Sequence, residues 1–180
     1  MSEISRYRHL VLKYCHDAEG NPAPVLDIGS QGDPVCPWAW SLDLPHDAFA
    51  YYNSNHPPRG PIQIRADGFT HRAAEPETLQ AVVSSHLLED TAQSDWPRIL
   101  ALWASFLRPG GYLIILVPEC KLWAAAIARG QTPNCSHSGP EPSVGDVGKA
   151  AATIGLEVIE DRLTALDAND YTILTVLRKQ

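Results

Sequence analysis

Four segments of the sequence place polar residues directly after a short apolar run. The first reads DIGSQG over residues 27–32, and Asp43, Asp67 and His86 follow the next three runs. In an open α/β sheet, ligands bind beyond the carboxyl ends of the strands. Asp27, Asp43 and Asp67 are separated by 16 and 24 residues, which fits successive strands of one sheet. The spacing therefore predicts that these polar residues meet at one edge.

The residue types favour a nucleoside ligand at that edge. Gly29 and Gly32 allow a ligand to approach the backbone and its N–H groups. A carboxylate at Asp43 can accept both hydroxyls of a ribose, and Asp67 can accept from an adenine amino group. Singly, such residues usually cap turns, so the prediction rests on their order and spacing.

Alternating strand and helix patterns predict a parallel sheet covered on both faces. Strands are expected at residues 25–28, 39–44, 61–64, 79–84, 112–117, 156–159 and 171–177, and helices at 4–15, 95–107, 121–128 and 144–154. Residues 108–111, RPGG, predict the end of the helix at 95–107, because proline cannot continue it and glycine suits its C-cap.

Length and composition indicate one globular domain. The chain has 180 residues, 44% of them hydrophobic, and a net charge of −7 from 14 basic and 21 acidic side chains. The basic residues are scattered, which argues against nucleic acid as the main partner. No apolar run is long enough for a membrane span and no signal-peptide pattern is present, so we expect a cytoplasmic protein. Four widely spaced cysteines predict neither a disulfide framework nor a metal site.

Three segments resemble one enzyme family. Residues 25–32 (VLDIGSQG), 82–90 (VVSSHLLED) and 107–118 (LRPGGYLIILVP) resemble motifs of the class I S-adenosylmethionine-dependent methyltransferases of the "type 11" group. The resemblance is good from residue 25 to 117 and looser beyond. It implies a Rossmann-like α/β three-layer sandwich whose mostly parallel seven-stranded sheet has its last strand antiparallel.

The resemblance also implies S-adenosyl-L-methionine as cofactor and a division of the single domain. Residues 1–20 would form an N-terminal helix, 25–118 the cofactor-binding core, and 119–180 a C-terminal part with a substrate-side loop at 130–145. The implied cofactor-binding residues are Asp27, Gly29, Ser30, Gly32, Asp43, Leu44, Asp67, Gly68, Ser84 and Ser85.

His86 is the candidate catalytic residue. Methyl transfer needs a general base only when the nucleophile must lose a proton, and an imidazole can take that proton near neutral pH. An alternative of equal weight is that His86 only bonds to the backbone or shapes the pocket. In the loop at 130–145, His137 and Asn134 are further candidates for contact with the acceptor, which we expect to be a small molecule.

The sequence departs from the family between Gly29 and Asp43. The family has a full helix there, but Pro34 and Pro37 predict a short turn or no helix. Gln80 stands where the family often has Asp. Trp38 and Trp40 flank this connection, either as core or lid packing or as a stacking platform.

Three other functions compete. A nicotinamide-dependent oxidoreductase would need the G-x-G-x-x-G fingerprint, which Pro34 interrupts. A methyltransferase fold that has lost catalysis and serves as a binding or scaffold module is the main alternative. A nucleic-acid methyltransferase would show a basic face or an Asn/Asp-Pro-Pro-Tyr motif, and the sequence has Ser84-Ser85-His86 at that strand end.

Overall fold

A computed structural model of the chain describes residues 3–44, 63–130 and 142–180. Its centre is a seven-stranded sheet with the order β3-β2-β1-β4-β5-β7-β6. The strands are β1 (Val25–Ile28), β2 (Trp40–Asp43), β3 (Ile64–Arg65), β4 (Leu79–Ser85), β5 (Leu107–Pro118), β6 (Glu157–Leu163) and β7 (Thr172–Arg178). Neighbouring strands from β3 to β5 are parallel, and β7 is antiparallel to both β5 and β6.

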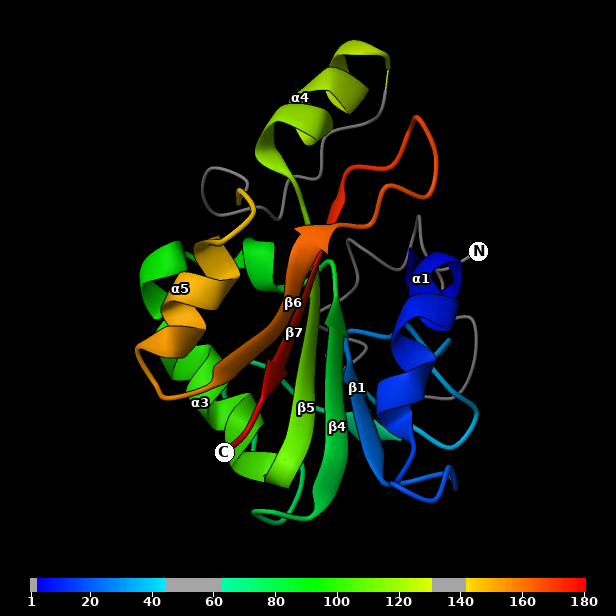
Figure 1. Cartoon of the computed structure of the whole chain (residues 1–180), viewed down its shortest axis with the longest axis vertical. Helices are drawn as coiled ribbons and strands as arrows, with labels where there is room; N and C mark the ends of the chain where they lie inside the picture. The colour runs from blue at the N-terminus through cyan, green and yellow to red at the C-terminus, as the bar shows by residue number, and fades with distance from the viewer. Residues whose placement is uncertain (1–2, 45–62, 131–141) are drawn as a thin grey trace.

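Helices cover both faces of this sheet, which gives the three layers (Figure 1). The α-helices are α1 (Glu3–Val11), α3 (Trp96–Phe106), α4 (Cys120–Ala128) and α5 (Asp146–Ala152), and the 3₁₀ helices are η1 (Leu12–Cys15), η2 (Leu88–Asp90) and η3 (Gln93–Asp95). In Figure 1, α1 lies on one face, α3 and α5 lie on the other, and α4 extends beyond the carboxyl ends of β4 and β5. The predicted fold class is therefore confirmed.

The apolar run in β5 follows from burial on both faces of the sheet. Leu113, Ile115 and Val117 belong to the core cluster under α3 and α5, whereas Ile114 and Leu116 belong to the cluster under α1. A strand covered on both faces needs no polar alternation. This strand consequently supplies apolar side chains to both halves of the core.

Helix α3 begins and ends where its sequence suggests. Pro97 occupies its first turn, where a missing N–H costs little. Its buried face includes Ile99, Leu100 and Trp103, at the spacing of an amphipathic helix. The helix ends at Phe106 and the chain becomes extended at Leu107, two residues before Pro109. Helices usually end at or before the residue that precedes a proline.

Most predicted elements are confirmed, and three strands show the differences of bounds that matter most. β5 begins at Leu107, five residues before the predicted start, and β6 continues to Leu163. β3 is described only as Ile64–Arg65. Most of the predicted substrate-side loop, including His137 and Asn134, lies outside the described residues.

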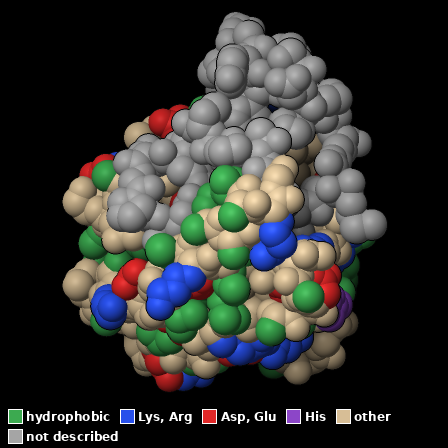
Figure 2. Space-filling model, turned by 90° about the horizontal axis from the view of Figure 1, so that it is seen from above, with side chains coloured by type: hydrophobic (Ala, Val, Ile, Leu, Met, Phe, Trp, Pro, Cys, Tyr) green, Lys and Arg blue, Asp and Glu red, His purple; other side chains and the backbone are tan. Residues whose placement is uncertain are grey.

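The described surface agrees with a mixed charge distribution. Seen from above, its coloured part carries basic and acidic side chains interspersed with apolar ones (Figure 2). Within residues 3–44, 63–130 and 142–180, no helix has the length and apolar character needed to cross a membrane. In those same ranges, no three His, Cys, Asp or Glu side chains are grouped so that they could hold a metal ion.

Candidate functional site

The carboxyl ends of β1, β2 and β4 lie next to one another. Ile28, the last residue of β1, pairs with Leu42 of β2 on one side and with Ser84 of β4 on the other. The N–H of Gly29 extends the pairing by donating to the carbonyl of Leu42 at 2.8 Å. On the outer side, the N–H of Ala66 donates to the carbonyl of Asp43 at 2.9 Å. The predicted strand-end residues are thus brought to one edge of the sheet.

The segment after β1 is a tight turn with an unusual backbone. Three of its four residues have positive φ, namely Gly29 (80°), Gln31 (52°) and Gly32 (73°). Glycine adopts this conformation without a steric penalty, whereas a residue such as Gln31 is rarely found there. The predicted glycines therefore stand where the turn requires them.

No helix follows this turn. Residues 29–39, all of them described, form turns and bends until β2 begins at Trp40. The prediction that Pro34 and Pro37 prevent a helix is confirmed. A side chain of α1 holds the connection in place instead. Arg8 donates to the carboxylate of Asp33 at 2.9 Å and to the carbonyl of Pro34 at 2.8 Å.

Asp27, in β1, supports this connection through a hydrogen bond. Its side chain is fully buried, and its Oδ2 atom accepts a hydrogen bond from the N–H of Val35 at 2.6 Å. The Oδ1 atom has no hydrogen-bond partner. Burial raises the pKa of Asp27 to about 8, against the opposing effect of the Val35 hydrogen bond. A buried carboxylate with one unsatisfied oxygen favours its neutral form.

Asp43 holds the same turn from the side of β2. It is 5% exposed, and its Oδ2 atom accepts from the N–H of Gln31 at 2.8 Å, while Oδ1 accepts from its neighbour Leu44 at 3.0 Å. Burial raises the pKa of Asp43, and these backbone bonds oppose that rise. An ionised carboxylate has about four acceptor positions, so two bonds leave about two for a ligand. Leu44, half-buried, is the last residue described before residue 63.

The serines of the site differ in what their hydroxyls do. Ser30 is turned inward, where its hydroxyl bonds to that of Ser41 and accepts from the N–H of Gly32 at 3.3 Å. Ser84 and Ser85, at the end of β4, have buried hydroxyls that find no hydrogen-bond partner among the described residues. Buried hydroxyls are usually satisfied, so these two are suited to meet a ligand at this edge.

Asp67 and Gly68 form the turn after β3. The carboxylate of Asp67 accepts from the N–H of Phe69 at 2.8 Å and from the hydroxyl of Thr70 at 3.0 Å. A Cβ atom on Gly68 would lie 2.4 Å from a methyl group of Ile28, and its carbonyl accepts from the indole of Trp103 at 2.7 Å. Gly68 therefore permits close packing of the turn on β1, and Asp67 caps the turn.

The two tryptophans of the first connection and Gln80 have ordinary structural environments. Trp38 packs against the core cluster under α1, with its ring edge against His16 at 5.1 Å between centroids. Trp40 is 50% exposed. Gln80 accepts a hydrogen bond from Nε of Arg108 at 2.9 Å, which ties β4 to the start of β5.

His86 ends β4 with a positive φ of 52° and donates its N–H to the carbonyl of Leu116 at 2.8 Å. Its Nε2 atom lies 3.1 Å from the hydroxyl of Thr172, and its Nδ1 atom lies 3.6 Å from Oε1 of Glu89. The second distance exceeds that of a hydrogen bond. The ring is thus held among protein groups from three elements, beside the strand ends that carry Ser84 and Ser85.

Sequence reasoning missed the residues that surround His86. Tyr7 of α1 stacks on its ring at 6.4 Å between centroids, and Tyr171 meets it edge-on at 5.9 Å. Tyr7 also bonds to Thr172 and Asp170 across more than 160 residues of sequence. No periodicity or motif in the sequence signals contacts of that separation.

Comparisons with known proteins agree with this architecture. A sequence model of the methyltransferase domain matches residues 2–161. An S-adenosylmethionine-dependent methyltransferase from Mesorhizobium loti is similar with a TM-score of 0.68 and 16% identity, covering 97% of this chain and 96% of that one. One from Archaeoglobus fulgidus has a TM-score of 0.63 and 14% identity, covering 98% and 92%. No curated protein matches.

A third similar structure contains ligands. It is the Burkholderia thailandensis 1,6-didemethyltoxoflavin-N1-methyltransferase with bound 1,6-didemethyltoxoflavin and S-adenosylhomocysteine. Its TM-score is 0.64 at 16% identity, covering 99% of this chain and 79% of that one. Because the domain match spans most of the sequence and the seven-stranded sheet has the antiparallel last strand that the resemblance implied, the chain belongs to the class I methyltransferases, the family that uses S-adenosylmethionine as cofactor.

Proposed function

We propose that this chain transfers the methyl group of S-adenosylmethionine to a small-molecule acceptor, with the cofactor lying across the ends of β1, β2 and β4. The observation that carries the proposal is the turn at residues 29–32. Its glycines let a ligand approach the backbone closely. Asp43 accepts from Gln31 within the turn, and Asp27 accepts from Val35 in the connection that follows it.

Each strand end would hold a different part of the cofactor. Asp43 would accept the ribose hydroxyls through the acceptor positions that Gln31 and Leu44 leave open. The unsatisfied hydroxyls of Ser84 and Ser85 would face the sulfonium end. Gly29, Ser30 and Gly32 would contact the methionine and ribose. Leu44 would pack on the adenine face, and Asp67 and Gly68 would lie at the adenine edge. Asp27 would support the loop after β1.

The chemistry asks little of the protein beyond positioning. S-adenosylmethionine supplies a methyl group on a good leaving group, so alignment of the acceptor can provide much of the rate. His86 would take the proton of an acceptor that must lose one. The nearby carboxylate of Glu89, 3.6 Å from Nδ1, would compensate the positive charge that the imidazole then gains.

Titration calorimetry with S-adenosylhomocysteine tests the cofactor site without knowledge of the acceptor. We expect Asp43→Ala to weaken binding by about 1–3 kcal/mol, the range for losing charge-assisted hydrogen bonds. Asp43→Asn separates the loss of the negative charge from the loss of support for the turn, because an amide oxygen can still accept from the N–H of Gln31. Asp17→Ala, in an exposed turn before β1, is the control and should bind normally. Equal affinity of Asp43→Ala and wild type, in folded protein, would remove Asp43 from the site.

A small molecule is the acceptor that the observations favour. The similar Burkholderia thailandensis enzyme acts on such a molecule, and the net charge of −7 disfavours nucleic acid. A screen of methyl acceptors should therefore include small heteroaromatic amines and phenols, with product detected by mass. Nucleic acid included in the same screen should remain unmethylated.

A second candidate is a binding or scaffold module without catalysis. It is favoured by one observation: residues 29–39 contain no helix, and the hydroxyl of Ser30 is bonded to Ser41. A family member with this connection lacks the helix N-terminus that would face the cofactor. No binding of S-adenosylhomocysteine at millimolar concentration by folded protein would decide for this candidate.

A further inference from the structure

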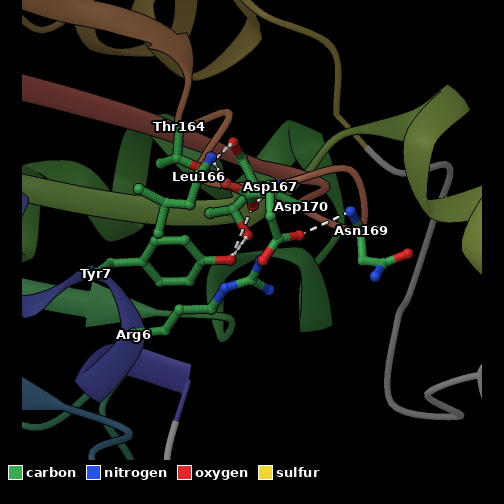
Figure 3. Close-up of polar contacts among 8 residues, drawn as sticks. Arg6, Tyr7, Thr164, Leu166, Asp167, Asn169 and Asp170 are labelled. Atoms are coloured by element: carbon green, nitrogen blue, oxygen red, sulfur yellow. Dashed lines mark hydrogen bonds and ion pairs between the residues drawn. The ribbon is translucent and has the colours of Figure 1, made fainter.

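His86 is one end of a chain of hydrogen-bonded side chains that reaches helix α1 and the connection between β6 and β7. The chain runs from His86 to Thr172, then to Tyr7 and finally to Asp170. The Nε2 to Oγ1 distance is 3.1 Å, the Thr172 to Tyr7 distance between hydroxyl oxygens is 2.7 Å, and Tyr7 reaches Oδ1 of Asp170 at 3.0 Å. Figure 3 shows Tyr7 pointing at the Asp170 carboxylate from α1, with Arg6 alongside.

The Asp170 end of this chain is a fixed acceptor. Its carboxylate also accepts from the N–H groups of Leu166 at 2.7 Å and Thr172 at 3.1 Å, and from the hydroxyl of Thr164. Burial alone would raise the pKa of Asp170, but these hydrogen bonds together lower it. Asp170 is therefore ionised at neutral pH and has no proton to donate.

This fixed acceptor sets the direction of every bond in the chain, because each hydroxyl has one hydrogen. Tyr7 must donate its hydrogen to Asp170. Its oxygen is then an acceptor for Thr172, since two oxygens 2.7 Å apart need a hydrogen between them. With its hydrogen given to Tyr7, the Thr172 oxygen can only accept from His86. The proton of that bond must lie on Nε2.

We propose that Tyr7 is a positioning residue that, through Thr172, keeps the proton of His86 on Nε2. His86 can then accept a further proton only at Nδ1, the atom that faces Glu89 at 3.6 Å. The consequence for methyl transfer rests on the proposed function, because it specifies which atom of His86 could receive the acceptor's proton. The placement of the proton is a property of the protein alone.

Nitrogen-15 NMR of the histidine rings reads this property directly, because the shifts of the two ring nitrogens report which one is protonated. The His86→Gln variant identifies the His86 signals among seven histidines. In the neutral ring of the wild type, we expect Nε2 to be the protonated nitrogen. A neutral His86 with its proton on Nδ1 would overturn the proposal.

Tyr7→Phe removes one hydroxyl and keeps the ring that stacks on His86. The hydrogen of Thr172 then loses Tyr7 as acceptor and turns to Nε2, and the proton of the imidazole moves to Nδ1, toward Glu89. We expect the Nδ1-protonated form to become the major neutral form. An unchanged ring spectrum would show that Tyr7 only packs against His86.

Two substitutions of Thr172 repeat the test should Tyr7→Phe fold poorly. Thr172→Val removes the hydroxyl within the same shape and should also move the proton to Nδ1, whereas Thr172→Ser keeps the hydroxyl and should restore the wild-type spectrum. Equal spectra for the Val and Ser variants would contradict the proposal. Titration with S-adenosylhomocysteine is performed on the same samples. A failure of cofactor binding is then seen separately from a failure to keep the proton of His86 on Nε2.

Discussion

Two buried carboxylates support the connection between β1 and β2, with different electrostatic consequences. Asp27 is fully buried with one oxygen unsatisfied, and burial raises its pKa to about 8. Asp43 is almost as buried, but both of its oxygens accept backbone N–H groups and it retains positions for further donors. Asp27 therefore acts in the scaffold, and Asp43 is the residue available to a ligand.

The raised pKa of Asp27 makes folding stability depend on pH. Between its ordinary pKa of 3.8 and about 8, the folded chain keeps a proton that the unfolded chain has lost. The free energy of unfolding then falls as pH rises through this window, by at most about 1.4 kcal/mol per pH unit. Asp27→Asn has no such titration, so its stability relative to wild type should rise from about pH 5 to about pH 8.

Urea unfolding at several pH values measures this difference. Asp17→Asn serves as the control, because the pKa of exposed Asp17 is lowered by its backbone bond to Asn21 and the group is ionised in both states above about pH 5. Its stability relative to wild type should stay flat in that window. A flat result for Asp27→Asn as well would show that Asp27 is ionised in the folded protein.

Residues of the site could be predicted from the sequence where the backbone conformation requires a particular residue type. Gly29 and Gly32 were found because a turn at a strand end needs positive φ. Ser30 stays predicted to line the cofactor. Its hydroxyl bonds to Ser41 of the neighbouring strand, and no sequence pattern indicates that orientation of the side chain. The cofactor roles of the site residues remain predictions.

At the level of elements, the turn after β3 depends on one close approach. Gly68 lies against Ile28, so a Cβ atom added to it would meet a methyl group at 2.4 Å. We expect Gly68→Ala to lower the free energy of unfolding by about 1–3 kcal/mol, the usual cost of overpacking. Chemical unfolding measures this loss. In an Ile28→Ala background the clashing methyl is gone, so the added cost of Gly68→Ala should shrink; strictly additive costs would contradict the explanation.

Element order was predictable because each strand and helix has its own local signal. The apolar run of β5 and the helical spacing of α3 are such signals, and Pro34 and Pro37 correctly predicted the missing helix. The start of β5 was predicted too late, since residues 108–111 read as a helix stop. They belong to β5, where they form an irregularity between the paired residues Leu107 and Tyr112, because the helix has already ended at Phe106.

Across the whole molecule, α1 joins the first residues described to the last hairpin. Its side chains cover the core cluster that includes Val83 and Leu116, and Arg6 pairs with Asp167 at 2.7 Å. The Arg6–Asp167 pair links residues 161 positions apart. Local patterns indicated that α1 is amphipathic but could not say which sheet face or loop it would meet.

The packing of α1 on the sheet should contribute to the free energy of unfolding of the whole domain. Val11, the last residue of α1, is fully buried, so Val11→Ala should cost about 1–3 kcal/mol of unfolding free energy. His9 is exposed on the same helix, and His9→Ala should change little. Similar unfolding midpoints for the two variants would indicate that α1 unfolds separately from the sheet.

The position of β7 has a consequence for biosynthesis. This strand is the last element of the order along the chain, yet in the sheet it lies between β5 and β6. While a ribosome still encloses residues 172–178, β5 and β6 have no partner between them. A nascent polypeptide at that stage leaves the edge of β5 without its hydrogen-bonded neighbour, and an open strand edge of this kind can pair with another polypeptide.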